Sequence, residues 1–110
     1  CIVVIATDIP LVDRQLRRVA LRATHALART GSYSGNGSGD IALAFSTANR
    51  VEHFNKSKFK EIRMLYDEEL SPVFEAVVEV VEEALISSLF HGQTVQGVRG
   101  KVLRSLREYT

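Results

Sequence analysis

Sulfur, aromatic side chains and long apolar runs are all scarce in this chain of 110 residues, which has one cysteine, one methionine and no tryptophan. A single cysteine excludes an internal disulfide framework, and no Cys-x-x-Cys or Cys/His spacing indicates a zinc site. No apolar stretch approaches the roughly 20 residues that a membrane span needs. We therefore expect no metal, no cofactor and no membrane partner. With no signal-peptide pattern, we also expect a cytoplasmic protein.

An excess of charge of one sign is absent as well, because 14 Lys and Arg face 13 Asp and Glu, a net charge of +1. Five arginines fall within residues 11–29, but no aromatic residues are interleaved to stack on bases. A solvated helix face is the commoner role of such a run. We expect no nucleic-acid partner. The length and the 45% apolar fraction fit a single unit over residues 1–110.

The apolar spacing predicts an alternation of strands and helices. Strands are expected at IVVIA (2–6) and IALAFST (41–47), with an ambiguous strand at 59–66. Helices are expected at 11–29 and at 71–90, where Ser71 would be the N-cap and Pro72 the first helical residue. A short helix is expected to carry Val102, Leu103, Leu106 and Tyr109. The buried stripe of the 71–90 helix is predicted to be Phe74, Val77, Val78, Val81, Ala84, Leu85 and Leu89, and its solvated face Glu75, Glu79, Glu82 and Glu83.

The two apolar strands have the composition of strands that are buried on both faces. A small isolated domain with two or three strands has difficulty covering both faces, and its exposed edges invite pairing with other strands. We infer that strands of another polypeptide complete the sheet.

The lone cysteine stands at position 1, directly before a β-branched run. It could be the lipidated end of a lipoprotein, an arbitrary fragment end, or a nucleophile exposed when a peptide bond was cut. A lipidated cysteine normally leads into a flexible polar tether, and Ile2, Val3, Val4 and Ile5 instead predict a buried strand. Together with the incomplete sheet, this favours the C-terminal product of a cut precursor.

The glycine-rich stretch GSYSGNGSG (31–39) follows a predicted helix and precedes a predicted strand. A phosphate-binding loop needs the opposite order, in which the loop leads into a helix N-terminus. The stretch is therefore either a plain surface turn or a mobile edge of an active site.

Three stretches now point to a family. VVIATDIP, LRRVALRATHALARTGS and SGDIALAFSTAN occur in this order within residues 2–49, and FEAVVEVVEEAL continues the pattern. They resemble the L-aminopeptidase/D-esterase and β-peptidyl aminopeptidase family of self-cleaving hydrolases. The resemblance implies an α/β (α+β) fold, a four-layer αββα sandwich like that of N-terminal-nucleophile hydrolases. It also implies that residues 1–110 are the C-terminal β chain of an autoproteolysed precursor, associated with a separate α chain in a homo-oligomer of αβ pairs.

The same resemblance implies that Cys1 attacks an amide or ester carbonyl, while Ser38 and Asp40 support it by hydrogen bonding. The chemistry is reasonable, because an α-amine ordinarily has a pKa of about 7.7 to 8.0 and can accept the nucleophile's proton. Without the resemblance, Ser38 and Asp40 would be ordinary turn residues. Family members carry Ser or Thr at position 1, so the cysteine is either natural or an engineered replacement.

The other polar candidates are weaker. Ser46 and Asn49 follow a strand and could line the site or be structural, while His25, His53 and His91 lack matching partners. The predicted activity is cleavage of an amide in a small substrate or peptide through a covalent acyl-enzyme, as an aminopeptidase or as a pantetheine hydrolase of carbapenem biosynthesis. Acyl transfer of the ornithine acetyltransferase type, or a non-catalytic subunit in which Cys1 is incidental, remain as alternatives.

Overall fold

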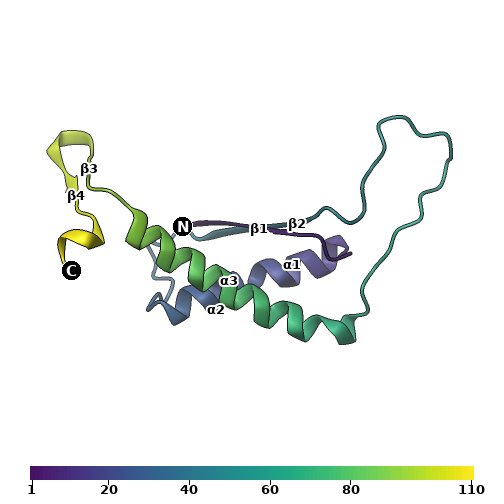
Figure 1. The fold of residues 1–110 in the computed structure, drawn as a ribbon, viewed down its shortest axis with the longest axis horizontal. Helices are drawn as coiled ribbons and strands as arrows, with labels where there is room; N and C mark the ends of the chain where they lie inside the picture. The colour runs from purple at the N-terminus through teal and green to yellow at the C-terminus, as the bar shows by residue number, and fades with distance from the viewer.

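The computed structural model describes all residues, 1–110, as one helical layer against a small sheet (Figure 1). The elements follow one another as β1 (Ile2–Thr7), α1 (Asp13–Leu21), α2 (Ala23–Arg29), β2 (Ile41–Ser46), a 3₁₀ turn (Asp67–Glu69), α3 (Leu70–His91), β3 (Val95–Gln96), a 3₁₀ turn (Val98–Gly100), β4 (Val102–Leu103) and a 3₁₀ turn (Leu106–Glu108). None of the helices is long and apolar enough to cross a membrane.

The central sheet consists of β1 and β2, which run parallel in a register that pairs Ile2 with Ile41 and Thr7 with Ser46. A parallel pair needs a long crossover connection, and α1 and α2 provide it. Both strands therefore begin at one edge of the sheet and end at the other. The two strand predictions are confirmed to within one residue at their ends.

All three long helices lie on one face of this sheet, below it in Figure 1. Two small groups of buried side chains hold the layers together. The first contains Leu11, Val19 and Leu70, and the second contains Ala23, Ala26 and Val81. Ile5 of β1 packs against both groups, so the sheet and the helices share one continuous core.

The predicted helix over residues 11–29 is divided in two at Arg22, which itself keeps helical angles of φ −69° and ψ −17°. Its first residue is Asp13 rather than residue 11. Gln15 explains this start, because its side-chain oxygen accepts the Val12 N–H at 3.2 Å. The same side chain is completely buried and donates to the Leu65 carbonyl at 2.7 Å. An apolar pattern could not identify this buried glutamine.

The expectation that the arginines of α1 and α2 form a solvated face is wrong for several of them. The Arg22 guanidinium lies 3.8 Å from the ring centroid of Phe74 on α3. Arg29 pairs with Glu82 at 3.0 Å, so this glutamate is not part of a solvated face either. These contacts fasten the crossover helices to α3.

The helix predicted at 71–90 is confirmed, but it begins at Leu70, directly after the 3₁₀ turn. Ser71 is therefore not its N-cap, and Pro72 occupies the third helical position rather than the first. Proline is tolerated there because the first four N–H groups of a helix have no partner within the helix.

Two further predictions near the C-terminal half are wrong. Residues 59–66 form no strand, since their backbone groups bond to a side chain and a loop instead of a neighbouring strand: Asn49 holds Arg63, and Leu65 N–H donates to the Pro10 carbonyl. The predicted terminal helix is replaced by a hairpin of β3 and β4 and a 3₁₀ turn. Positive φ values at Arg99 (60°) and Gly100 (74°) turn the chain there and exclude a helix.

The face of the sheet opposite the helices is bare within this chain. Ile2, Val4, Ile41, Leu43 and Phe45 all point to that side and are exposed, Val4 by 61%. Their neighbours Val3 and Ile5 point to the helices, as alternation along a strand requires. Within these 110 residues the strands are thus buried on one face only, contrary to the prediction of two. The end of the α3 stripe is similar, because Ala84 and Leu89 are exposed.

Candidate functional site

Cys1 and Asp40 meet at the edge where the two parallel strands begin. Because Ile2 is paired with Ile41, the residues directly before each strand must also lie opposite one another. The Ile41 N–H donates to the Cys1 carbonyl at 2.9 Å and extends the ladder to this point. The register thus brings together two residues that are 39 positions apart in the sequence.

The carboxylate of Asp40 is the centre of a small polar cluster. Its Oδ1 accepts a hydrogen bond from the amino group of Cys1 at 3.3 Å, and its Oδ2 accepts one from the Ser38 Oγ at 2.5 Å. The Ser34 Oγ lies 3.4 Å from the same Oδ2. The side chains of Cys1 and Asp40 are 31% and 19% exposed, so the group is open to a substrate from solvent. We call these four residues the Cys1 cluster.

The electrostatics of the cluster keep Asp40 ionised. The hydrogen bond from Ser38, followed by that from the amino group of Cys1, lowers the pKa of the Asp40 carboxyl below its usual value. Its negative charge therefore persists at neutral pH beside the amino group. A carboxylate in this place favours the positively charged form of that amine.

The glycine-rich loop holds the two serines by its backbone. Gly35 and Ser38 close a turn in which the Ser38 N–H donates to the Gly35 carbonyl at 2.8 Å. Ser34 has a φ of 52°, a left-handed conformation that is uncommon for serine. Sequence reasoning missed Ser34, because nothing in the pattern GSYSGNGSG separates it from the other serines. Its backbone angle and its approach to Asp40 identify it only in three dimensions.

Ser46 and Asn49 lie at the opposite end of the sheet and are not brought to the Cys1 cluster. Ser46 donates to the Ile9 carbonyl at 2.6 Å, and Asn49 holds Arg63 with bonds of 2.8 and 3.0 Å. A six-residue strand is about 20 Å long, which separates them from the cluster. Of the two roles left open for them, the structure places both in structural contacts.

The histidines are also distant from the cluster in their contacts. His91 bonds its own helix through the Ser87 carbonyl, and the ring of His53 stands edge-on against Phe54. His25 lies on α2 facing α3. No group of three His, Cys, Asp or Glu side chains has the arrangement of a metal site.

A cavity of about 440 Å³ opens beside Asp40, between β2 and the crossover helices. Its lining is mostly apolar and includes Val3, Leu21, Leu27 and Ala42. Asp40 is the only acidic group in the lining. The cluster therefore borders a space that accepts an apolar group, with a negative charge at its rim.

In chemical terms, the cluster combines a thiol, an amine on the same residue and an ionised carboxylate that contacts this amine. A thiol becomes a strong nucleophile when a nearby base removes its proton. The amine can serve as that base, and the carboxylate stabilises the ammonium that results. This set of groups is suited to covalent attack on a carbonyl.

Comparison with known proteins agrees with this chemistry. The family model described as "Peptidase family S58" matches residues 1–103. The beta-peptidyl aminopeptidase BapA of Sphingosinicella microcystinivorans is 38% identical over 105 residues, which are 96% of this chain and 26% of that protein.

Two solved structures have the same fold. The PH0078 protein of Pyrococcus horikoshii OT3 has a TM-score of 0.83 at 52% identity, over 93% of this chain and 29% of its own. The L-aminopeptidase D-Ala-esterase/amidase of Ochrobactrum anthropi has a TM-score of 0.82 at 36% identity, over 98% and 33%. The latter is described as a new variant of the N-terminal-nucleophile hydrolase fold. The predictions of family and of fold class are thereby confirmed.

These relatives are considerably longer than the chain. It spans about a quarter of the curated relative and about a third of the two solved structures. The structure described above accordingly corresponds to one layer of helices and one sheet of the larger fold.

Proposed function

Since this chain belongs to peptidase family S58, we propose that the protein it forms is an aminopeptidase that uses Cys1 as an N-terminal nucleophile. The observation that carries the proposal is the contact between the amino group of Cys1 and Asp40, with Ser38 bonded to the other oxygen of the same carboxylate. Relatives named as aminopeptidases support it.

In the proposed reaction, the neutral amine of Cys1 takes the proton from its own Sγ as the sulfur attacks the substrate carbonyl. The C–N bond of the substrate then breaks, and the ammonium returns the proton to the departing amine. This leaves a thioester on Cys1. Water attacks the thioester, the same amine takes a proton from it, and the acid product leaves with Sγ restored.

Asp40 acts on the charged intermediate state of the amine. Its carboxylate stabilises the ammonium that forms while the sulfur attacks, and it restrains the rotation of the amino group. Ser38 donates to the carboxylate and keeps it oriented. Ser38 is thus a positioning residue in this scheme, and Cys1 is the residue that reacts.

We further propose that the free amine of Cys1 arises by self-cleavage of a precursor, and that the preceding part of the precursor remains bound as a separate α chain. The exposed apolar face of β1 and β2 supports this, since Val4 and Leu43 need a covering layer. The much greater length of the relatives supplies enough chain for that layer. The second sheet of a four-layer αββα sandwich would cover this face.

For the substrate, we favour a peptide or amide with a free β-amino acid at its N-terminus, because a curated relative with 38% identity is named a beta-peptidyl aminopeptidase. Pantetheine conjugates and acyl transfer to glutamate or ornithine are the competing outcomes. No contact in this chain favours either of them.

The test uses the full-length protein and three sets of substrates: p-nitroanilides of β- and α-amino acids, and pantetheine amides. We expect release of p-nitroaniline and, with an activated ester, a mass increase of one acyl group on the peptide that contains Cys1. Ser46→Ala is the matched control, since it removes a hydroxyl far from the cluster. An active enzyme acylated elsewhere than on Cys1 would refute the mechanism, and a product that grows only when ornithine is added would indicate acyl transfer.

A further inference from the structure

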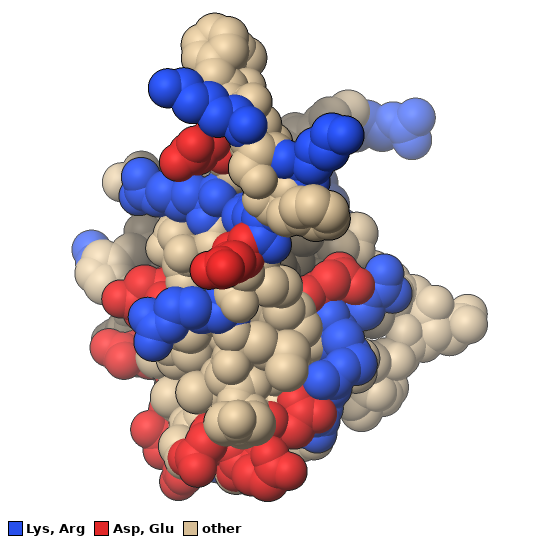
Figure 2. Space-filling model, turned by 90° about the vertical axis from the view of Figure 1, so that its right-hand side faces the viewer, with Lys and Arg blue, Asp and Glu red and all other residues tan.

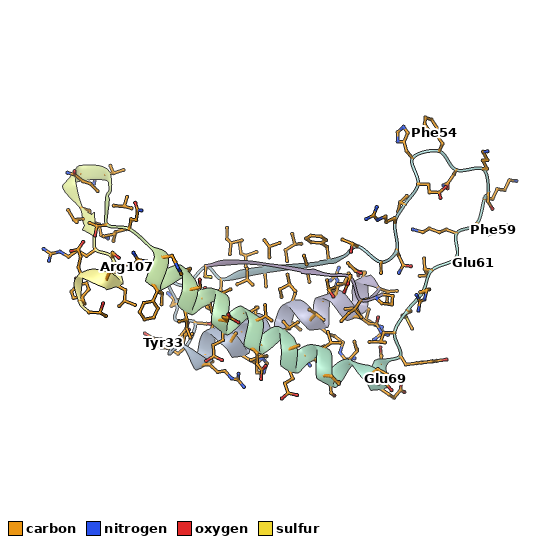
Figure 3. All side chains as sticks on the ribbon, in the orientation of Figure 1. Tyr33, Phe54, Phe59, Glu61, Glu69 and Arg107 are labelled. Carbon is orange, nitrogen blue, oxygen red and sulfur yellow. The ribbon has the colours of Figure 1, made fainter.

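A long excursion of the chain between β2 and α3, residues 48–66, stands away from the sheet and the helices (Figure 3). We call it the arm. Its base is fixed, because Asn49 bonds both backbone groups of Arg63 and Leu65 N–H donates to Pro10. Its outer part is bare, with Phe54 and Phe59 exposed by 82% and 87%. Two such exposed phenylalanines on a fixed support are typical of a contact surface.

The arm is basic. Between residues 48 and 66 the chain has five basic side chains and two acidic ones. The basic ones are Arg50, Lys56, Lys58, Lys60 and Arg63. None of them takes part in an ion pair within the chain. The arm therefore presents uncompensated positive charge to its surroundings.

The segment that follows has the opposite charge. From residue 64 to residue 98 there is no Lys or Arg, while seven carboxylates occur there. Asp67 and Glu82 pair with Arg14 and Arg29. The other five carry uncompensated charge: Glu68, Glu69, Glu75, Glu79 and Glu83.

These two surfaces share one end of the molecule. Figure 2 looks at that end, with Lys and Arg gathered in its upper part, where the arm lies, and acidic side chains in its lowest part. Figure 3 shows Phe54 at the tip of the arm and Glu69 at the start of α3, on opposite sides of this end. Within one chain the two surfaces form no ion pair. Their charges can compensate each other only between molecules.

We propose that this end of the molecule binds a second copy of the chain about a two-fold axis, with the arm of each copy against the acidic start of α3 of the other. A two-fold axis turns a surface that is basic on one side and acidic on the other into a self-complementary one. The phenylalanines of the arm provide apolar contact, and the charges fix the register. A second copy supplies the acidic partner surface that the structure displays, whereas another part of the precursor would need one of its own.

The test is charge reversal in the full-length protein, followed by native mass spectrometry and light scattering. Lys56→Glu/Lys58→Glu/Lys60→Glu places like charges at both contacts of the dimer, as does Glu68→Lys/Glu69→Lys/Glu75→Lys. We expect each variant alone to associate at least 10-fold more weakly than the wild type. A mixture of the two variants should regain association, because in the mixed dimer each contact again joins opposite charges.

Reversal at the other end of the molecule, Arg99→Glu/Lys101→Glu, is the matched control and should leave the association unchanged. If a reversed variant does not fold, carbodiimide cross-linking of mixed ¹⁴N- and ¹⁵N-labelled wild type gives the same answer, since arm lysines should link to α3 glutamates across isotopes. Unchanged association in the arm variant, no recovery on mixing, or links only within one isotope would overturn the proposal. The arm would then cover another part of its own polypeptide.

Discussion

The two ends of the β1–β2 sheet carry similar polar residues but use them differently. Where the strands begin, Cys1, Ser38 and Asp40 bond to one another through side chains and the amino group. Where the strands end, Ser46 and Asn49 bond to backbone groups of neighbouring loops. A side chain whose bonds go to the backbone fixes the fold, whereas a group of ionisable side chains open to solvent is available for chemistry.

This arrangement is the reverse of the common one. In open parallel α/β sheets, ligands usually bind beyond the carboxyl ends of the strands. Here that end is occupied by loop anchors, and the candidate site lies at the amino end. An N-terminal nucleophile explains the exception, because a first residue whose amine takes part in catalysis must stand at the beginning of a strand.

The largest effect on turnover short of removing the nucleophile is expected for Asp40→Asn. The amide keeps the shape of the carboxylate but not its charge, so the ammonium formed during attack loses its stabilising partner. We expect kcat to fall by about 10²-fold or more, with the melting temperature nearly unchanged. Steady-state kinetics of the processed enzyme measure this. A variant of normal activity would make Asp40 a turn residue and erase the difference between the two ends.

A stability effect at low pH is expected at the other end of the sheet, where Asp67 ties the start of α3 to α1. Hydrogen bonds from Arg14, then from Gln15, lower the pKa of Asp67 to about 2. A depressed carboxyl pKa contributes stability that is present above the usual value of 3.8 and is lost as the pH falls through the folded value. Thermal melts of the full-length protein should therefore fall more steeply from about pH 4 to about pH 2 than melts of Asp67→Asn. Parallel curves would show that the ion pair has no such role.

A smaller effect on stability alone is expected for Ser46→Ala. Its hydroxyl bonds the Ile9 carbonyl at 2.6 Å, and loss of one such bond costs about 1 kcal/mol. Activity per folded molecule should stay within about twofold of the wild type. Chemical denaturation and active-site titration separate the two quantities. A large fall in kcat without loss of stability would place Ser46 in the site after all.

The smallest effect is expected for Glu79→Gln on the exposed face of α3. This side chain has no ion pair within the chain, so neither turnover nor the melting temperature should change measurably. The same variant serves as a single-charge control for the dimer proposal. A loss of activity would mean that the helix face takes part in the reaction.

The sequence predicts best what local patterns determine. The strands at 41–46 and the helix up to His91 follow from apolar spacing, and they are confirmed. Contacts between distant segments were accessible only through the family resemblance, as for Cys1 and Asp40, or were missed, as for Ser34. The register of two strands decides such contacts, and no local pattern encodes it.

The wrong predictions have a common physical cause. Residues 59–66 have strand-like composition but no neighbouring strand in this chain, so their backbone groups bond elsewhere. The burial of Gln15 depends on Leu65 and Asp67, which lie about 50 residues away. Propensity gives way in both places to tertiary partners that a single sequence does not reveal.

The most direct test of the account is the processing of Cys1→Ala in the full-length protein. The substitution removes the attacking atom and changes the volume little, so folding should survive. If the thiol of Cys1 both frees its own amine and performs turnover, this variant remains a single uncut polypeptide on a denaturing gel and has no activity, while Ser46→Ala gives two chains. Two chains from Cys1→Ala, with Ala at the start of the shorter one, would show that another agent makes the cut and would contradict the central role of Cys1.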